Sequence, residues 1–384
     1  MNYKIILVFT SIIIGVIACK QTEYIGPISP CDLSNIPYNP SSYTVVSPNG
    51  FPAMEHPEDN PITVQGIELG RHLFYDPILS RDSTISCSSC HDINKAFTDG
   101  LAKSKGIDNR IMSRSSMSLI NIGYSWIKGR AYNFMWDGRF ATLEEQIIKG
   151  PIENPLEMDN TWEKVETDLR QHPTYPRMFR EAFGIDCYDG ISKELVAKAI
   201  AQFERTLNSA GSRYDEDVWV PLVYLSNQEL RGMTLFIGDA AGSPSTKDAE
   251  CAHCHSFSKN KALFARNEFS NNGLDSAQTL FDFADNGYGD ATGNAPENGQ
   301  FREVSLRNVG LTAPYMHDGR FQTLEEVVDH YATGGHYSPN LASELTTAPT
   351  ITSLDANDKA DIVAFLHALT DSTYFNKPEW SSPF

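Results

Sequence analysis

The sequence CSSCH at residues 87–91 is matched by CAHCH at residues 251–255, so the chain contains two C-x-x-C-H motifs. This spacing attaches a c-type haem, because each cysteine can form a thioether with a haem vinyl group and the adjacent histidine binds the iron. A zinc site would need a second C-x-x-C close by, and a redox dithiol a thioredoxin-like βαβ pattern; the sequence shows neither. We therefore predict two covalently bound haems c, held by Cys87, Cys90, His91, Cys251, Cys254 and His255.

The N-terminus has the pattern of a bacterial lipoprotein signal. Lys4 precedes an apolar run at residues 5–17, and the sequence VIAC at residues 16–19 resembles a lipobox. The run is too short to span a bilayer comfortably, although an uncleaved anchor is the alternative. We expect residues 1–18 to be a signal peptide and Cys19 to carry the lipid. The folded part would then be periplasmic or otherwise extracytoplasmic, and anchored to a membrane.

The net charge of the chain limits its binding partners. The net charge of −18 makes nucleic acid an unsuitable partner. The acidic surface could steer a basic electron-carrier protein, or it could serve only solubility.

Two cysteines, Cys31 and Cys187, are left once the haem and lipid sites are assigned. They could form a disulfide in an oxidising compartment.

The chain contains an internal duplication. Residues 135–145 and 316–326 are identical at nine of eleven positions. Each copy follows one of the C-x-x-C-H motifs, so the repeat unit is a whole haem-binding domain. We predict an N-terminal haem domain at residues 61–225 and a C-terminal haem domain at residues 226–384, preceded by a tether at residues 19–60.

The local patterns are helical. Residues 192–207 and 356–369 have helical periodicity, and T-x-x-E capping boxes begin at Thr142 and Thr323. Alternation typical of strands is scarce. The sequence thus predicts a mainly α protein whose long loops fold around cofactors.

Longer motifs of this chain resemble those of a known family, the bacterial di-haem cytochrome c peroxidases and their MauG-type relatives. The resemblance runs from about residue 66 to residue 369. It rests on GRHLFYD at 70–76, AFTDG at 96–100, WDGR at 136–139, GPIENPLEM at 150–158, LRN at 306–308 and APYMHDG at 313–319. It implies two cytochrome-c-like domains with one haem each. The N-terminal haem would be the peroxide site, and the C-terminal haem would pass electrons.

The resemblance also indicates what lies opposite each iron. MauG-type proteins use a tyrosine at the position of Tyr331, which makes it the expected axial ligand of the second iron; Met316 and a purely structural Tyr331 are alternatives. The peroxidases close the first haem with a histidine whose position falls near Ile107. Residues 92–171 contain no histidine; His72, which precedes the first motif, is the alternative ligand. We expect an open first iron that needs no reductive activation.

Three further residues match catalytic positions of the family. Glu157 matches the distal glutamate that assists cleavage of the O–O bond, and Gln146 matches a glutamine that can hydrogen-bond peroxide. Trp136 matches the tryptophan between the haems, which can relay oxidising equivalents. Out of this context, the first two would be surface residues and the third a core aromatic.

The resemblance further implies a calcium ion between the domains. The backbone carbonyls of Thr312 and Pro314 match two of its ligands. Ser115 stands where the family has an asparagine, and Asn121 lies nearby as a substitute. Serine is a weaker ligand for a hard cation than asparagine.

Together these features predict a di-haem c-type peroxidase that reduces hydrogen peroxide to water. Its electrons would come from a small donor protein such as a cytochrome c or a cupredoxin. Two alternatives stay open: a MauG-like oxidase that modifies residues of a partner protein, and a di-haem electron-transfer cytochrome without peroxidase activity. Family members are often dimers, so a homodimer is also open.

Overall fold

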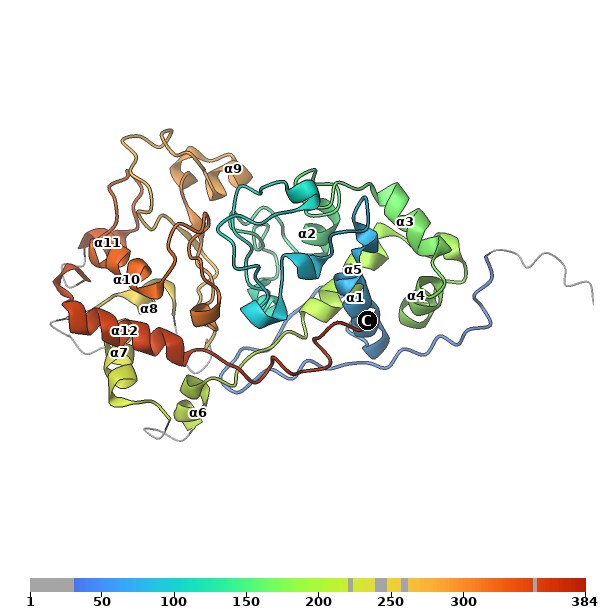
Figure 1. The fold of residues 1–384 in the computed structure, drawn as a ribbon, viewed down its shortest axis with the longest axis horizontal. Helices are drawn as coiled ribbons and strands as arrows, with labels where there is room; N and C mark the ends of the chain where they lie inside the picture. The colour runs from blue at the N-terminus through green and yellow to red at the C-terminus, as the bar shows by residue number, and fades with distance from the viewer. Residues whose placement is uncertain (1–30, 220–223, 239–246, 257–261, 348–350) are drawn as a thin grey trace, which may run out of the picture.

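The structure, a computed structural model, describes residues 31–219, 224–238, 247–256, 262–347 and 351–384. The predicted signal peptide at residues 1–18 and the predicted lipid site at Cys19 lie outside the described residues. The molecule is elongated, with helices α1–α5 toward one end of its long axis and helices α7–α12 toward the other (Figure 1). We call these the N-terminal and C-terminal halves. Among the described residues, no helix has both the length and the hydrophobicity of a transmembrane span.

Helices and loops make up nearly all of the described chain, which confirms the predicted mainly α class. The N-terminal half contains α1 (Val64–Tyr75), α2 (Leu143–Lys149), α3 (Trp162–Gln171), α4 (Tyr175–Phe183) and α5 (Lys193–Glu204). After α6 (Arg213–Trp219), the C-terminal half contains α7 (Asn227–Ile237), α8 (Cys251–Cys254), α9 (Tyr288–Thr292), α10 (Leu324–Ala332), α11 (Ser343–Thr347) and α12 (Ala356–Ala368). In the described residues the sheet is limited to β1 (Phe269–Ser270), antiparallel to β2 (Phe301–Arg302).

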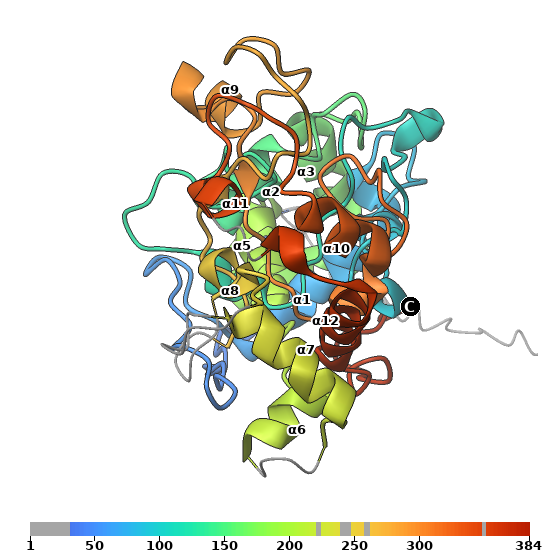
Figure 2. The same cartoon turned by 90° about the vertical axis from the view of Figure 1, so that its left-hand side faces the viewer.

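Each half is built on a close crossing of two helices. In α1, a Cβ on Gly70 would overlap the carbonyl oxygen of Ala199 in α5. In α7, a Cβ on Gly232 would overlap the carbonyl oxygen of Asp361 in α12, and Figure 2 shows these two helices crossing. Glycine is required at both places because any side chain would push the helices apart.

The predicted helix starts are confirmed. The hydroxyl of Thr142 accepts from the Glu145 N–H at 3.0 Å, and that of Thr323 accepts from the Glu326 N–H at 3.2 Å. In α10 the Glu326 carboxylate also accepts from the Thr323 N–H at 3.2 Å, which completes the capping box. In α2 the Glu145 carboxylate accepts from Ala141 instead. Each such cap stabilises its helix by about 1 kcal/mol.

Residues 31–60 lie along the surface of both halves. The Leu33 N–H donates to the Asp186 carbonyl at 3.0 Å, next to α4. Farther along, Phe51 is buried in a small cluster with Tyr124 and Leu263, which belong to different halves. Phe51 and Tyr124 meet edge to face, with ring centroids 5.3 Å apart. This segment therefore bridges the two halves.

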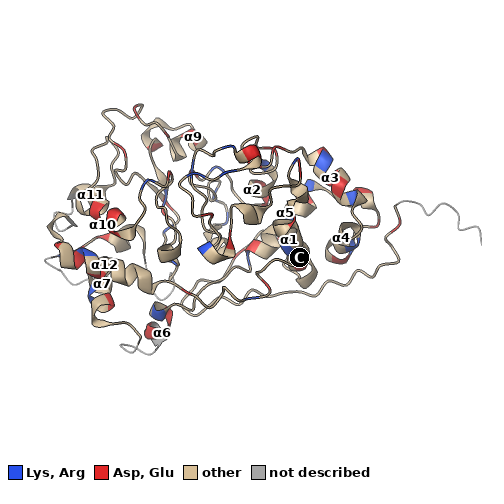
Figure 3. Cartoon of the chain, viewed as in Figure 1, with Lys and Arg blue, Asp and Glu red and all other residues tan. Residues whose placement is uncertain are grey.

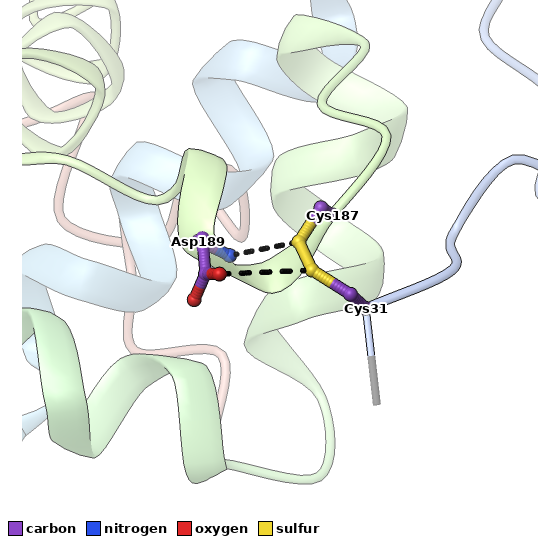
Figure 4. Close-up of side chains that lie close together, drawn as sticks. All are labelled: Cys31, Cys187 and Asp189. Carbon is purple, nitrogen blue, oxygen red and sulfur yellow. Dashed lines mark hydrogen bonds between the residues drawn. A yellow bond between two sulfur atoms is a disulfide. The ribbon is translucent and has the colours of Figure 1, made fainter. Parts of the chain in front are cut away.

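A disulfide fixes the start of this segment. Cys31 is bonded to Cys187, 156 positions away, as the leftover cysteines suggested (Figure 4). The Asp189 N–H donates to the Cys187 sulfur at 3.4 Å, and an Asp189 carboxylate oxygen lies 3.8 Å from the Cys31 sulfur. Although three potential metal ligands meet here, both sulfurs are in the disulfide and neither is the thiolate that a metal needs.

The C-terminal segment returns to the N-terminal half (Figure 1). Tyr374 and Trp380 are buried in the same core as α1 and α5. The Tyr75 hydroxyl donates to the Trp380 carbonyl at 2.5 Å, and the Arg71 guanidinium donates to the Pro378 carbonyl at 2.7 Å. The last residues of the chain therefore complete the first core. Acidic and basic side chains are mixed along the helices of both halves (Figure 3).

Candidate functional site

A cavity of about 580 Å³ lies in the N-terminal half, and we call it the N-terminal cavity. Its walls carry the first C-x-x-C-H motif together with Gln146 of α2 and Glu157 of the loop after it. The structure thus brings the first motif and two of the predicted catalytic residues together. Within the described residues, His91 is the only histidine that lines this cavity.

His91 is oriented by the backbone. Its Nδ1 lies 2.8 Å from the Phe97 carbonyl, which can only accept, so Nδ1 carries the proton. Burial lowers the pKa of His91, which keeps the imidazole neutral and leaves Nε2 with a free lone pair. Ala96 and Phe97 have φ of 52° and 57°, a left-handed turn that directs this carbonyl. The Trp380 ring packs edge-on against the Phe97 ring, with centroids 6.5 Å apart.

Glu157 presents a carboxyl group to the same cavity. The Asn154 side-chain amide donates to Glu157 Oε1 at 2.8 Å. Burial raises the pKa of Glu157, and this hydrogen bond only partly opposes the shift. Ile107, the position where the family's histidine was expected, is fully buried, and its N–H donates to the Glu157 carbonyl at 2.7 Å. The Ile107 side chain does not line the cavity.

A second carboxyl group, which no sequence motif indicated, lines the same cavity. Glu204, in the last turn of α5, lines the N-terminal cavity and is 5% exposed. Its Oε2 has no hydrogen-bond partner among the described residues. Burial raises the pKa of Glu204 to about 8, against the opposing effect of Arg205. A glutamate on the apolar face of a helix was the available signal, because neighbouring Phe203 and Ala201 belong to that face.

A cavity of about 280 Å³, the C-terminal cavity, holds the second motif. His255 is oriented in the same manner as His91, with Nδ1 3.1 Å from the Val304 carbonyl and 3.3 Å from the Phe264 carbonyl. Burial lowers the pKa of His255 and keeps it neutral. Both motif histidines therefore present Nε2 as a possible metal ligand.

Both candidates for the second axial ligand line the C-terminal cavity. The Asn272 side-chain amide donates to the Tyr331 hydroxyl at 3.3 Å and to the Met316 sulfur at 3.5 Å. Burial raises the pKa of Tyr331 to about 12. Tyr331 is therefore a neutral phenol unless a cation in the cavity stabilises the phenolate. Asn272, which the sequence did not single out, holds the two candidates side by side.

One wall separates the cavities, and Trp136 is part of it. Trp136 and Ser115 line both cavities. The Trp136 indole N–H donates to the Ser115 carbonyl at 3.0 Å, and the Ser115 N–H donates to the His317 carbonyl at 2.8 Å. The Arg302 N–H donates to the Trp136 carbonyl at 2.9 Å. Backbone groups from both halves thus fix the indole between the two motifs.

Known proteins are similar to this chain in sequence and in fold. The family model of the di-haem cytochrome c peroxidases matches residues 64–219. The methylamine utilization protein MauG of Methylorubrum extorquens is 32% identical over 317 residues, which are 83% of this chain and 81% of that protein. The chain belongs to the di-haem cytochrome c peroxidase and MauG family. It is therefore an enzyme of the oxidoreductase class.

Two other family members support the assignment. The cytochrome c551 peroxidase of Nitrosomonas europaea is 32% identical over 323 residues, 82% of each chain. A solved MauG-like protein associated with microbial copper homeostasis superposes with a TM-score of 0.72 at 33% identity, covering 90% of this chain and 99% of that one. Membership of the family implies haem cofactors. The oriented histidines and the paired cysteines beside each cavity fit such a group.

Three other residues named from the sequence have different locations. His72 lines neither cavity; its Nδ1 lies 2.8 Å from the Glu68 carbonyl, and its ring packs against Phe384. Thr312 and Pro314 line the C-terminal cavity.

The predicted calcium ligands form a weak set. The Ser115 hydroxyl donates to the Met316 carbonyl at 3.0 Å, and the Asn121 amide is paired with the Ser209 backbone. Ser115, Asn121 and the two carbonyls offer neutral oxygens without a carboxylate, which calcium sites in proteins usually contain. Calcium at this place remains a prediction of the resemblance.

Proposed function

We propose that this protein is a di-haem c-type peroxidase that reduces hydrogen peroxide to water with electrons from an external donor protein. The observation that carries the proposal is the Glu157 carboxyl group in the cavity of His91, where no other histidine lines the wall among the described residues. The cavity therefore offers both an acid and room for a small oxidant.

Two haems c would be held by the six motif residues, with His91 and His255 as proximal iron ligands. When bound, these groups supply iron centres that accept and pass on single electrons. We also propose Tyr331 as the axial ligand of the second iron, with Met316 as the alternative. The first iron would keep an open position.

Matched backbone contacts just after the ends of α5 and α12 support the proposed duplication. Asn121 and Asn308 both adopt left-handed conformations, with φ of 60° and 62°. The Asn121 N–H donates to the Leu207 carbonyl after α5 at 2.8 Å, and the Asn308 N–H donates to the Leu369 carbonyl after α12 at 3.1 Å. Together with the two glycine crossings, these contacts favour two copies of one haem-binding unit.

Glu157 would move the proton that peroxide reduction requires. Because Asn154 donates to Oε1, that oxygen is the acceptor and the acidic proton resides on Oε2. The raised pKa keeps this proton on the carboxyl group at higher pH than in an exposed glutamate. The Gln146 side chain, which also lines the cavity, would orient the substrate by hydrogen bonding.

Trp136 would carry oxidising equivalents between the two halves. Its indole borders both cavities and is held by a hydrogen bond to Ser115. A donor protein would then reduce the enzyme through the C-terminal half. Export as a lipoprotein is part of this proposal, and the Cys31–Cys187 disulfide agrees with an oxidising compartment.

A MauG-like oxidase is the second candidate. The observation that favours it is that Tyr331 lines the same cavity as His255, since MauG-type proteins resemble this chain at that position. Such an enzyme would use the same peroxide site but withdraw electrons from residues of a partner protein. Peroxide chemistry without turnover of a small donor would support this candidate over the first.

The test is peroxide-dependent oxidation of a reduced cytochrome c or cupredoxin by the holoprotein. We expect turnover by the wild type, and a rate about 10²–10⁴-fold lower for Glu157→Gln with unchanged haem content, since that is the usual contribution of a positioned acid. Glu163→Gln, which alters an exposed glutamate of α3, is the matched control. A Glu157→Gln enzyme with the wild-type rate would contradict the proposed role. No reaction of the wild type with peroxide would leave the electron-transfer alternative.

A further inference from the structure

Arg302, at the end of β2, is a buried cation without a carboxylate partner among the described residues. It is 6% exposed. Its Nη2 donates to the Asn267 side-chain oxygen at 2.9 Å, whereas its Nη1 has no hydrogen-bond partner in the described chain. Burial lowers the pKa of Arg302 to about 9, and nearby Arg130 adds to the effect.

Other buried arginines of this protein are neutralised. Arg205 pairs with Glu144 at 2.7 Å, and Arg307 pairs with Asp215 at 2.6 Å. A buried charge without a counter-ion is strongly destabilising. Arg302 is therefore expected to meet an anion that the described part of the polypeptide does not provide.

The position of Arg302 indicates which anion this is. Arg302 lines the C-terminal cavity together with His255 and Trp136. Its guanidinium also faces the Phe134 ring, 5.8 Å from the centroid, on the side of the wall between the cavities. A haem c carries two propionate carboxylates, and a carboxylate accepts hydrogen bonds from a guanidinium with good geometry.

We propose that Arg302 binds a propionate carboxylate of the haem attached at Cys251 and Cys254. The inference rests on the proposed function for the presence of that haem. Nη1 supplies the hydrogen bond, and the positive charge neutralises the carboxylate. The Arg302 N–H, which donates to the Trp136 carbonyl, keeps this charge next to the wall between the cavities. Because a nearby cation favours the reduced form of a redox centre, Arg302 raises the midpoint potential of this haem.

The test uses the holoprotein with Arg302→Gln, Arg302→Lys and Arg130→Gln. Arg130 is a suitable control because it lies close to Arg302, is paired with Glu268 at 2.8 Å, and does not line the C-terminal cavity. Spectroelectrochemical titration gives the potential of each haem, and resonance Raman spectroscopy gives the propionate bending band. Mass spectrometry of the wild type first establishes that both motifs carry haem.

We expect Arg302→Gln to lower the potential of the His255 haem and to shift its propionate band. Arg302→Lys keeps the charge and should retain most of the wild-type potential, and Arg130→Gln should change neither property. An unchanged Arg302→Gln protein, an equal shift in Arg130→Gln, or a shift confined to the His91 haem would each overturn the proposal. In those cases the proposed function stands, whereas a wild type without haem at Cys251 and Cys254 would overturn both.

Discussion

The buried carboxyl group of Glu204 makes the stability of this protein depend on pH. Its pKa is raised from an ordinary value of 4.5 to about 8, chiefly by burial, with Arg205 opposing and Glu144 adding to the shift. Between these two values the folded protein keeps a proton that the unfolded chain has lost. The folded state then binds more protons, so the free energy of unfolding falls as pH rises through this window.

The magnitude follows from the size of the window. At about 1.4 kcal/mol per pH unit, the change from 4.5 to about 8 corresponds to a loss of the order of 5 kcal/mol by pH 8, and no further loss above it. Glu204→Gln removes the titrating group while keeping the shape of the side chain. We expect this variant to be more stable than the wild type at pH 8 and to show a flatter stability profile between pH 5 and pH 8.

The assay is urea unfolding of the holoprotein at several pH values, followed by circular dichroism. Glu194→Gln is the matched control, because Glu194 lies on the same helix but is exposed. The control should follow the wild-type profile. If Glu204→Gln also followed it, Glu204 would be ionised in the folded protein, and the assignment of a buried neutral acid would be refuted.

Three further predictions concern other parts of the molecule. Replacing Cys31 and Cys187 by serine should lower the free energy of unfolding by about 2–5 kcal/mol in non-reducing urea titrations, since the disulfide closes a long loop. If a reductant destabilised the double variant as much as the wild type, the disulfide would not be the cause of the difference. Trp380→Ala should cost about 3–5 kcal/mol by the same measurement, because the indole is buried in the first core; a loss below 1 kcal/mol would mean that the segment detaches freely. Tyr331→Phe should change the optical spectrum of the oxidised C-terminal haem while Met316→Leu leaves it unaltered, and the reverse result would make Met316 the ligand.

The parts predicted from the sequence are those that depend on local spacing. Each C-x-x-C-H motif, predicted as a haem site, lies on the wall of one cavity, and T-x-x-E patterns correctly located the starts of α2 and α10. These features need only residues within a few positions of one another, whose geometry a helix or turn determines. The family resemblance then grouped Glu157, Gln146 and Trp136, and the structure places all three on cavity walls.

The features that were missed depend on contacts between distant parts of the chain. Nothing in the Pro- and Asn-rich composition of residues 31–60 indicates that Phe51 packs against Tyr124 and Leu263. Arg302 is a charged residue that would usually be exposed, and only the fold shows that it is buried at a cavity; the apolar neighbours of Glu204 on α5 were a local signal that was not used. Long-range burial of this kind has no periodic signal in a single sequence.

The return of the C-terminal segment has a consequence for the order in which the protein can mature. Trp380 is far from Phe97 in the sequence, yet it packs against Phe97, whose carbonyl accepts the hydrogen bond of His91. Until the segment around Trp380 has folded back onto the N-terminal half, that half lacks part of its core. The histidine of the first C-x-x-C-H motif is therefore fully supported only after this late docking step.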